Sequence, residues 1–570
     1  MKKQSLRFLL LTLIGILIYS CQNDDDFLEP QTTSKIAEIE NELKYGEKII
    51  LGKKLKNPYS VENMKKAFQN IKSSSNFSAR TPIVEISTSH YYVKFIPKNS
   101  EELGIIEKDS SLIAYDYPLD YEILQMGDYY HDPKVPIDQP TYHYASIPIG
   151  KEIPKGVEYV ILSDLFIPDE EDIPDDFKEL LTDEALKITG NLKEEKSAEK
   201  KTGLFSRPSK WRPAGTIKVW DDNIGQTTTT TRVFSHWEYY DCGDNGDEIL
   251  PIAQKTEQLE KVIKPIDNQC RRAVYRYITT TTNGSYVPVE GVKVRARRWF
   301  TTHTGITNSN GYYSCNGRFR RPANYKIKWK RYEFSIRWSW LSSAKYNGPK
   351  QRGDWNLNIK GGTQEYYATI FRAAHHYYYE NIKGLRRPPQ NGFWRTQMKI
   401  RAFKENVSEE GSLGSHTSGW RAFGLYSPIK IYTYQRPAID TYATVIHELA
   451  HGSHWNMDRS DFNDSETKVK ESWARGVQWE LTRMIYPTYR GGATIRPNYT
   501  QIVMDMTDPI VVPIYYNYGK RVDNVEGYTI RQIEDALIHQ ETWNSWRNNI
   551  KNKYNNGTEN NLDALFNYWD

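Results

Sequence analysis

A short run of residues, HELAH at positions 447–451, places two histidines four residues apart with a glutamate directly after the first. Residues 441–446 contain neither glycine nor proline, and Asp440 is suitable as the cap of a helix that starts there. Residues i and i+4 of a helix share one face, about 6 Å apart along the axis. Imidazole nitrogens bind zinc at about 2.0–2.1 Å, so His447 and His451 are predicted to share one ion.

Glu448 is expected to lie beside this ion, because the next residue of a helix is rotated away from the first. Zinc lowers the pKa of a water toward about 7, and a neighbouring carboxylate can take the proton and carry it to a leaving amine. The alternative is an amphipathic helix with two ordinary histidines. His454 is excluded as a further ligand, because it lies about 10.5 Å from His447 along the helix.

A third ligand is expected from a second helix. Glu471 follows His451 by 20 residues, which lets the first helix end, the chain turn and a second helix run back. Two imidazoles and one carboxylate leave a fourth position for water, as a catalytic zinc requires. Taken alone, Glu471 would be interpreted as a solvated helix carboxylate, and Asp458 is the other candidate for this position.

The motif together with Glu471 resembles the gluzincins, the zinc peptidases related to thermolysin and to the large aminopeptidases. The run ESWA at 471–474 is similar to the EGFA run of that group. The metzincin pattern is excluded, because it needs glycine and histidine where this chain has His454 and Met457. The resemblance implies a zincin-like domain, zinc as the cofactor and a peptide or protein substrate.

Other segments must support these residues. Arg475 stands where the family often has an aspartate behind a ligand histidine, so Asp458 or Asp461 is expected to supply that support. Tyr528 is the preferred candidate for stabilising the oxyanion, with further candidates in the same half of the chain: Tyr515, Tyr516 and His539. An exposed edge strand at 420–426 or at 429–434 is expected to bind an extended peptide.

The N-terminus has the pattern of an export signal. Basic residues precede an apolar stretch at 8–18 that is too short to span a bilayer comfortably. The following residues, IYSC at 18–21, resemble the lipobox of bacterial lipoproteins, which implies lipidation of Cys21 and a membrane anchor. The acidic run at 22–26 is similar to surface-export signals, so an outer-membrane, surface-exposed lipoprotein is expected; a solvated tether is the alternative.

The cysteine content and the net charge limit which disulfides, metal sites and partners are expected. After Cys21 the chain has Cys242, Cys270 and Cys315, which permits one disulfide in an oxidising compartment, and Cys242 with Cys270 is the expected pair. The sequence contains no CxxC pair, so a zinc site built from cysteines is not expected. A net charge of +5 is nearly balanced and argues against a nucleic-acid partner.

The sequence predicts a multidomain α+β protein. Residues 291–294 and 307–313 resemble the carboxypeptidase regulatory-like domain, a prealbumin-like β-sandwich, with Asn308 in place of the usual aspartate. The expected segments are a signal peptide (1–20), a tether (21–80), a small α+β domain (81–190), a linker (191–212), an all-β region (213–345) with the sandwich at about 266–345, and a zincin-like domain (360–570).

Two functions follow from these patterns. The first is a zinc-dependent peptidase in which Glu448 is the general base. The alternative is a surface binding or adhesion lipoprotein whose zincin-like domain is a relict. Metal content and cleavage of peptides would separate them.

Overall fold

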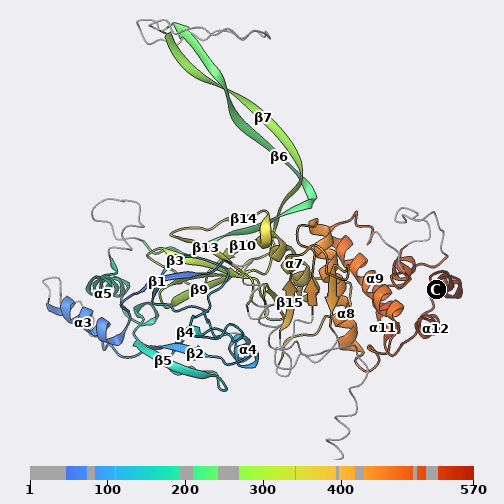
Figure 1. The fold of residues 1–570 in the computed structure, drawn as a ribbon, viewed down its shortest axis with the longest axis horizontal. Helices are drawn as coiled ribbons and strands as arrows, with labels where there is room; N and C mark the ends of the chain where they lie inside the picture. Colours follow the sequence, from blue (N-terminus) through green and yellow to red (C-terminus); the bar gives the residue numbers. More distant parts are fainter. Residues whose placement is uncertain are drawn as a thin grey trace, which may run out of the picture.

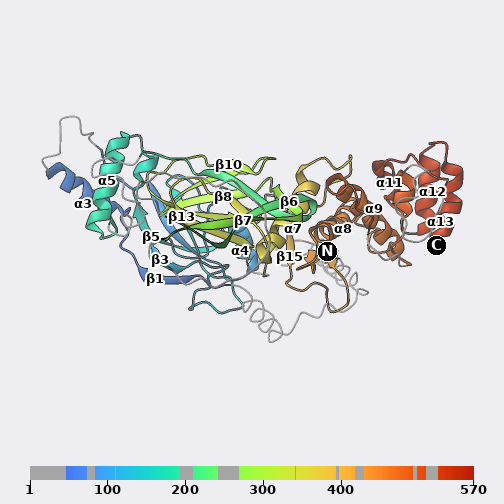
Figure 2. The same cartoon turned by 90° about the horizontal axis from the view of Figure 1, so that it is seen from above.

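The computed structural model describes residues 47–73, 84–109, 111–192, 209–241, 269–339, 342–392, 397–417, 429–491, 497–508 and 524–570. It is a mixed α+β structure, with the N-terminal elements and the C-terminal helices at opposite ends and β-sheets between them (Figures 1 and 2). Cys21 and the expected signal peptide lie outside the described residues. Within the described residues, no helix is long and apolar enough to cross a membrane.

The N-terminal unit combines small antiparallel sheets with three helices. In one sheet β2 lies between β4 and β5, and in the other β1 pairs with β3. The expected tether at 21–80 is wrong for residues 47–73, because β1 is hydrogen-bonded to β3 and Met64 of α3 is buried in a core shared with Phe177 of α5. The elements are β1 (Ile50–Lys54), α3 (Val61–Ser73), β2 (His90–Ile96), α4 (Ser100–Lys108), β3 (Tyr121–Gln125), β4 (His143–Pro148), β5 (Glu158–Leu165) and α5 (Asp175–Ile188).

Two sheets of the central region enclose a common core. Tyr313 of β10 donates a hydrogen bond to the Trp355 carbonyl, and Tyr325 of β11 lies against the Trp355 ring. One sheet has the order β13-β11-β8-β9, and the other has β10-β6-β14 with β7 paired to β6. Their strands are β6 (Ala214–Asp241), β7 (Gln269–Pro288), β8 (Lys293–Arg298), β9 (Thr301–Ile306), β10 (Tyr312–Ser314), β11 (Ala323–Lys328), β13 (Lys345–Gln351) and β14 (Leu357–Ile359).

The expected boundaries of this region, 213–345 for the whole and 266–345 for the sandwich, are too narrow. The first half of β6 enters the sheet before residue 266, and β14 closes it after residue 345. The turn expected at 307–313 is present: the Asn308 carboxamide accepts from the Tyr312 amide at 3.1 Å, and Gly311 adopts a positive φ of 73°.

β6 and β7 continue past the sheet as a long two-stranded ribbon that projects from the middle of the molecule (Figure 1). Thr227 pairs with Thr282 in this ribbon, which confirms that the threonine runs form strands. Cys270 lies on β7 opposite Tyr240, whereas Cys242 lies outside the described residues, and with it the expected disulfide. Cys315 is a buried free thiol.

The C-terminal region packs helices against a four-stranded sheet of order β12-β15-β17-β16. The first three strands are parallel, and β16 is an antiparallel edge strand. The expected start at residue 360 misses β12, which precedes it in the chain and pairs with β15. The elements are β12 (Phe334–Arg337), α7 (Gly362–Tyr379), β15 (Met398–Ala402), β16 (Gly414–His416), β17 (Ile429–Ile431), α8 (Ala438–Met457), α9 (Thr467–Ile485), α10 (Ile502–Thr507), α11 (Ile530–Leu537), α12 (Trp543–Lys553) and α13 (Leu562–Tyr568).

Candidate metal centre

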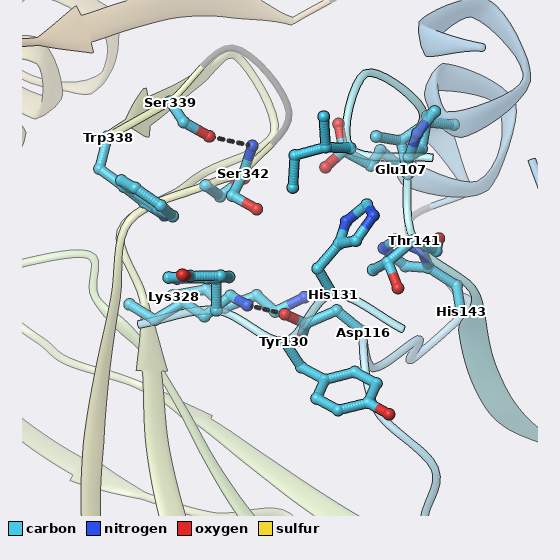
Figure 3. A pocket seen from close by; sticks show the side chains of 16 residues that line it. Glu107, Asp116, Tyr130, His131, Thr141, His143, Lys328, Trp338, Ser339 and Ser342 are labelled. Carbon is cyan, nitrogen blue, oxygen red and sulfur yellow. Dashed lines mark hydrogen bonds and ion pairs between the residues drawn. The ribbon is translucent and has the colours of Figure 1, made fainter. Parts of the chain in front are cut away.

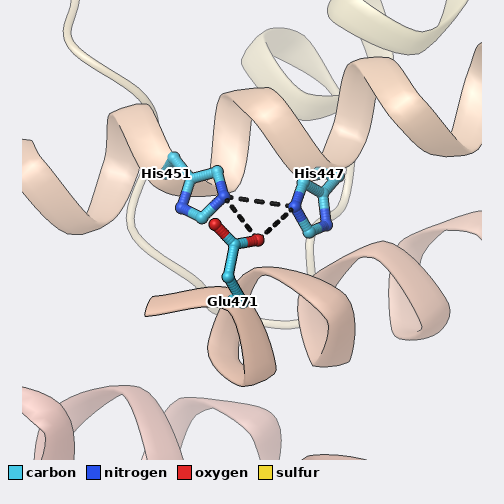
Figure 4. Close-up of side chains that lie close together, drawn as sticks. All are labelled: His447, His451 and Glu471. Atoms are coloured by element: carbon cyan, nitrogen blue, oxygen red, sulfur yellow. Dashed lines mark hydrogen bonds and ion pairs between the residues drawn. The ribbon is translucent and has the colours of Figure 1, made fainter. Parts of the chain in front are cut away.

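Helices α8 and α9 bring the three expected ligands together (Figure 4). The Nε2 atoms of His447 and His451 lie 3.1 Å apart. Oε2 of Glu471 lies 3.1 Å from the first of these nitrogens and 3.3 Å from the second. The side chains are mostly shielded from solvent, so the three donor atoms form a small, enclosed triangle between the two helices.

The spacing of this triangle fits a tetrahedral zinc ion. Ligand bonds of about 2.0–2.1 Å at the tetrahedral angle separate two donor atoms by about 3.3 Å. Hydrogen bonds alone do not explain the triangle well, because a neutral imidazole offers a single N–H and both histidines present Nε2 to the same point. Two imidazoles and one carboxylate are also the donor types that zinc prefers, so the residues present fit this metal.

The start of α8 is held by residues far away in the chain. The carboxylate of Asp222 accepts from the Ala438 amide at 2.9 Å, and the side-chain oxygen of Asn223 accepts from the Ile439 amide at 3.1 Å. The expectation that Asp440 caps the helix is wrong, because α8 begins two residues earlier and Asp440 lies within its first turn. Asp222 and Asn223, at the base of the β6–β7 ribbon, therefore supply hydrogen-bond acceptors to the start of the helix that carries both histidines.

Glu448 is only 5% exposed and lies directly against the backbone of β16. A Cβ atom added to Gly414 would lie 2.6 Å from its Oε1 atom, so the glycine leaves the space that the carboxylate fills. Burial raises the pKa of Glu448 to about 8, His447 opposes the rise, and the Glu471 carboxylate adds to it. A divalent cation at the triangle would favour the ionised form.

The edge strand differs from the expectation. Residues 429–431 form β17, which lies between β15 and β16 and is therefore internal, so the expectation of an edge at 429–434 is wrong. The alternative at 420–426 lies outside the described residues. The edge is β16, and it passes beside Glu448, where an extended peptide could add to the sheet.

The expected support from Asp458 and Asp461 is also wrong. Both carboxylates bind His539: its backbone amide donates to Asp458 at 2.7 Å, and its Nδ1 lies 2.8 Å from the Asp461 carboxylate. They follow α8 in the chain and tie its end to the segment after α11, and the described residues show them in a cluster separate from His447 and His451.

Two residues that sequence reasoning missed line the site instead. The Tyr499 ring stacks on His447 with centroids 6.2 Å apart, and Arg475 fixes it by donating to its backbone carbonyl at 3.2 Å. His416, the last residue of β16, stacks on His451 at 6.2 Å. Neither belongs to a sequence motif, and both reach the site only through the fold.

The oxyanion candidates fall in different places. Tyr528 is buried in the core, and its hydroxyl has no hydrogen-bond partner within the described residues. Tyr515 and Tyr516 lie outside the described residues, and His539 is held by the two aspartates. His454 is fully buried edge-on against Phe462 and belongs to no ligand cluster of the described chain, as its position on α8 predicts.

The fold and the site together define a class of protein: one with a candidate mononuclear metal centre of two histidines and one glutamate, set between two helices and beside an antiparallel edge strand. No family model, no curated protein and no solved structure matches the chain.

Proposed function

We propose that this chain is a zinc-dependent peptide hydrolase of the gluzincin type. His447, His451 and Glu471 hold the zinc ion, and Glu448 is the general base. One observation carries the proposal: three donor atoms of the types and spacing that zinc prefers meet between α8 and α9, with a buried carboxylate one residue after the first ligand.

Zinc held by these three residues would polarise a substrate carbonyl and lower the pKa of a water. Glu448 accepts a proton from that water and then donates it to the leaving amine. Its buried position keeps this proton from bulk solvent and favours a carboxyl that can hold it between the two steps. His416, stacked on His451 at the end of β16, is the proposed hydrogen-bond donor to the developing oxyanion.

The substrate is proposed to bind as an extended strand. Among the described residues β16 pairs with β17 alone, so its other edge is the proposed binding place for a peptide running antiparallel to it. This position places the peptide over Glu448, because Gly414 of the same strand contacts that carboxylate. The proposal includes zinc as the cofactor and a peptide or protein as the substrate. It also includes anchoring of the chain to the outer membrane as a lipoprotein, through Cys21.

A binding or adhesion lipoprotein is the second candidate, and the ribbon favours it. One face of β6–β7 exposes Phe234, Trp237, Tyr275 and Tyr277 to solvent. Exposed aromatic groups of this kind commonly mark interaction surfaces. This function requires no metal and no cleavage, so the two candidates make opposite predictions for the same sample.

The test uses the chain from residue 22 to residue 570, analysed for metal and incubated with a peptide library. We expect about one zinc per chain and cleavage that a chelator abolishes. Glu448→Gln should lower the cleavage rate by roughly 10²–10⁴-fold and keep the zinc. Glu410→Gln is the matched control, because Glu410 is exposed and precedes β16. A metal-free, inactive wild type, or full activity in Glu448→Gln, would refute the proposal.

A further inference from the structure

One face of the central sheet carries a block of four cations. Along β8 and β11, Val294, Ala296, Tyr325 and Ile327 point into the core, so the residues that alternate with them point to the other face. In the antiparallel register, Lys293 lies opposite Lys328, and Arg295 lies opposite Lys326. Like charges directly opposite each other on a sheet are destabilising, so this arrangement needs a compensating partner.

The N-terminal unit covers this face but does not neutralise it. Arg295 is 6% exposed and Lys326 is 4% exposed. Two carboxylates approach from the N-terminal unit, and each is paired with a cation outside the block: Asp116 with Lys345, and Glu107 with Arg337 at 3.2 Å. Asp116 still favours the charged forms of Lys326 and Lys328, and Lys328 donates to the Ala114 carbonyl at 3.3 Å. Within the described residues, however, no carboxylate forms a direct ion pair with a cation of the block.

Arg295 shows the imbalance most directly. Its Nε and Nη1 atoms are buried and make no hydrogen bond within the described residues. Burial lowers the pKa of its guanidinium, and the side chains of Tyr115 and Tyr117 oppose this change. Burial lowers the pKa of Lys328 well below its usual value, and Arg295 and Lys330 lower it further. Buried charges are normally paired, so the site lacks an anion.

A cavity of about 230 Å³ opens onto this block. Its basic wall is formed by Lys293, Arg295, Lys328, Lys330 and Arg331, and its apolar wall includes Leu112, Ala114 and Ile306. A smaller cavity of about 50 Å³ adjoins it and shares Glu107, His143 and Lys328 (Figure 3). The end of α4 adds Glu107, Lys108 and Asp109 to the lining of the larger cavity, so this cavity carries both signs of charge with cations in excess.

We propose that this cavity binds a phosphate or sulfate group carried by a small organic ligand. Arg295 has N–H groups on Nε and Nη1 that are buried without a partner among the described residues, and each can donate a charge-assisted hydrogen bond to an oxyanion. Lys328 and Lys330 supply further positive charge from β11 and the residues after it. The apolar wall accommodates the uncharged part of the ligand. The site lies on the N-terminal side of the central sheets and is independent of the proposed hydrolase reaction.

The test measures thermal unfolding and calorimetric binding of residues 22–570 with three probes at constant ionic strength: inorganic pyrophosphate, glucose 6-phosphate and glucose. Both phosphates should raise the unfolding temperature and bind, and glucose should do neither. A stronger effect of glucose 6-phosphate identifies a phosphorylated organic ligand, and a stronger effect of pyrophosphate identifies a free oxyanion. Equal stabilisation by sodium chloride at matched ionic strength would overturn the proposal.

Variants separate binding from folding. Arg295→Gln and Lys330→Gln should each weaken pyrophosphate binding roughly 10–100-fold, because each removes a charge-assisted contact. Lys330→Gln should not lower the unfolding temperature of the free protein, since it removes repulsion within the block. It is the decisive variant if Arg295→Gln fails to fold. Lys350→Gln, exposed on the same sheet and outside this cavity, should bind normally. Unchanged binding in Lys330→Gln would refute the site.

Discussion

Three cations of the C-terminal half are each paired with a buried carboxylate, whereas Arg295, buried where the N-terminal unit meets the central sheets, is not. The pairs are Arg372 with Asp221, Lys383 with Glu480, and Arg386 with Glu534. At the other site Arg295 and Lys328 form no such pair among the described residues. Removing one partner of a buried ion pair destabilises the fold. A buried charge that has no partner in the chain instead indicates a place for a ligand.

The metal centre has one unbalanced charge of its own. Glu448 is buried, and its carboxylate accepts no hydrogen bond within the described residues. It differs from the cationic block in sign and in surroundings, since the neighbouring triangle of donors is suited to a cation. By the same reasoning, each unbalanced site is completed by a ligand of the opposite charge.

The strongest test of this comparison breaks a balanced pair. Arg372→Met leaves the Asp221 carboxylate fully buried, with Tyr486 as its remaining side-chain partner, and should lower the free energy of unfolding by about 3–5 kcal/mol. Urea denaturation measures the change. The double variant Asp221→Asn with Arg372→Met should lose clearly less, because no charge is then stranded. If the single variant lowers the free energy of unfolding by less than about 1 kcal/mol, the pair does not contribute appreciably to stability.

A second test moves the carboxylate of Glu448, the buried acid beside the candidate metal centre. Gly414→Ala puts a methyl group 2.6 Å from Oε1 of Glu448, so the carboxylate must move. A shift of about 1 Å in a catalytic group costs on the order of 100-fold, and we expect that loss of cleavage with zinc retained. Gly392→Ala is the matched control, because nothing lies within 4 Å of the added carbon. Normal cleavage by Gly414→Ala would argue against Glu448 as the base.

A third test titrates the unbalanced cations. Burial lowers the pKa of Lys330 from 10.5 to about 8, Glu107 opposes this change, and Arg295 adds to it. Between pH 8 and 10.5 the unfolded chain binds more protons than the folded chain, so the free energy of unfolding should rise with pH, by about 1–3 kcal/mol. Lys330→Met should reduce the rise. Saturating pyrophosphate should also reduce it, because a bound anion keeps the lysine charged. A flat profile in the wild type would contradict the unbalanced charge.

The smallest expected effect comes from a balanced site at the surface. The Asp461 carboxylate, followed by that of Asp458, raises the pKa of His539 above 6.5. Its contribution to stability is therefore complete below about pH 6.5 and is lost as the pH rises through the higher, folded-state value. An NMR titration should place the pKa of His539 above that of a free histidine. His539→Gln should remove this part of the pH dependence, and a normal pKa would contradict the contact.

The parts of the site that local spacing determines could be predicted from the sequence. His447 and His451 meet because they are one helical turn apart, and Glu471 meets them because 20 residues suffice for a turn and a returning helix. The starts of α11 and α12 are also local features, because Thr529 and Thr542 each begin a helix with a capping box.

The remaining parts depend on contacts between distant segments. His416 and Tyr499 reach the site from a strand and a loop that no motif marks. The alternating charges of β8 would ordinarily be assigned to a solvent-facing side, and only the packing of the N-terminal unit makes them buried. Periodicity gives the face on which a side chain lies, but not what covers that face.

The cap supplied by Asp222 and Asn223 has a consequence for any attempt to isolate the C-terminal half. A fragment starting at residue 360 would leave the amides of Ala438 and Ile439 without these acceptors, and each lost cap contact costs about 0.5–2 kcal/mol. Fraying would begin two turns before His447 and spread toward it. The start of the helix that carries the histidine pair thus depends on the central strands, so we expect truncation to loosen the candidate metal centre.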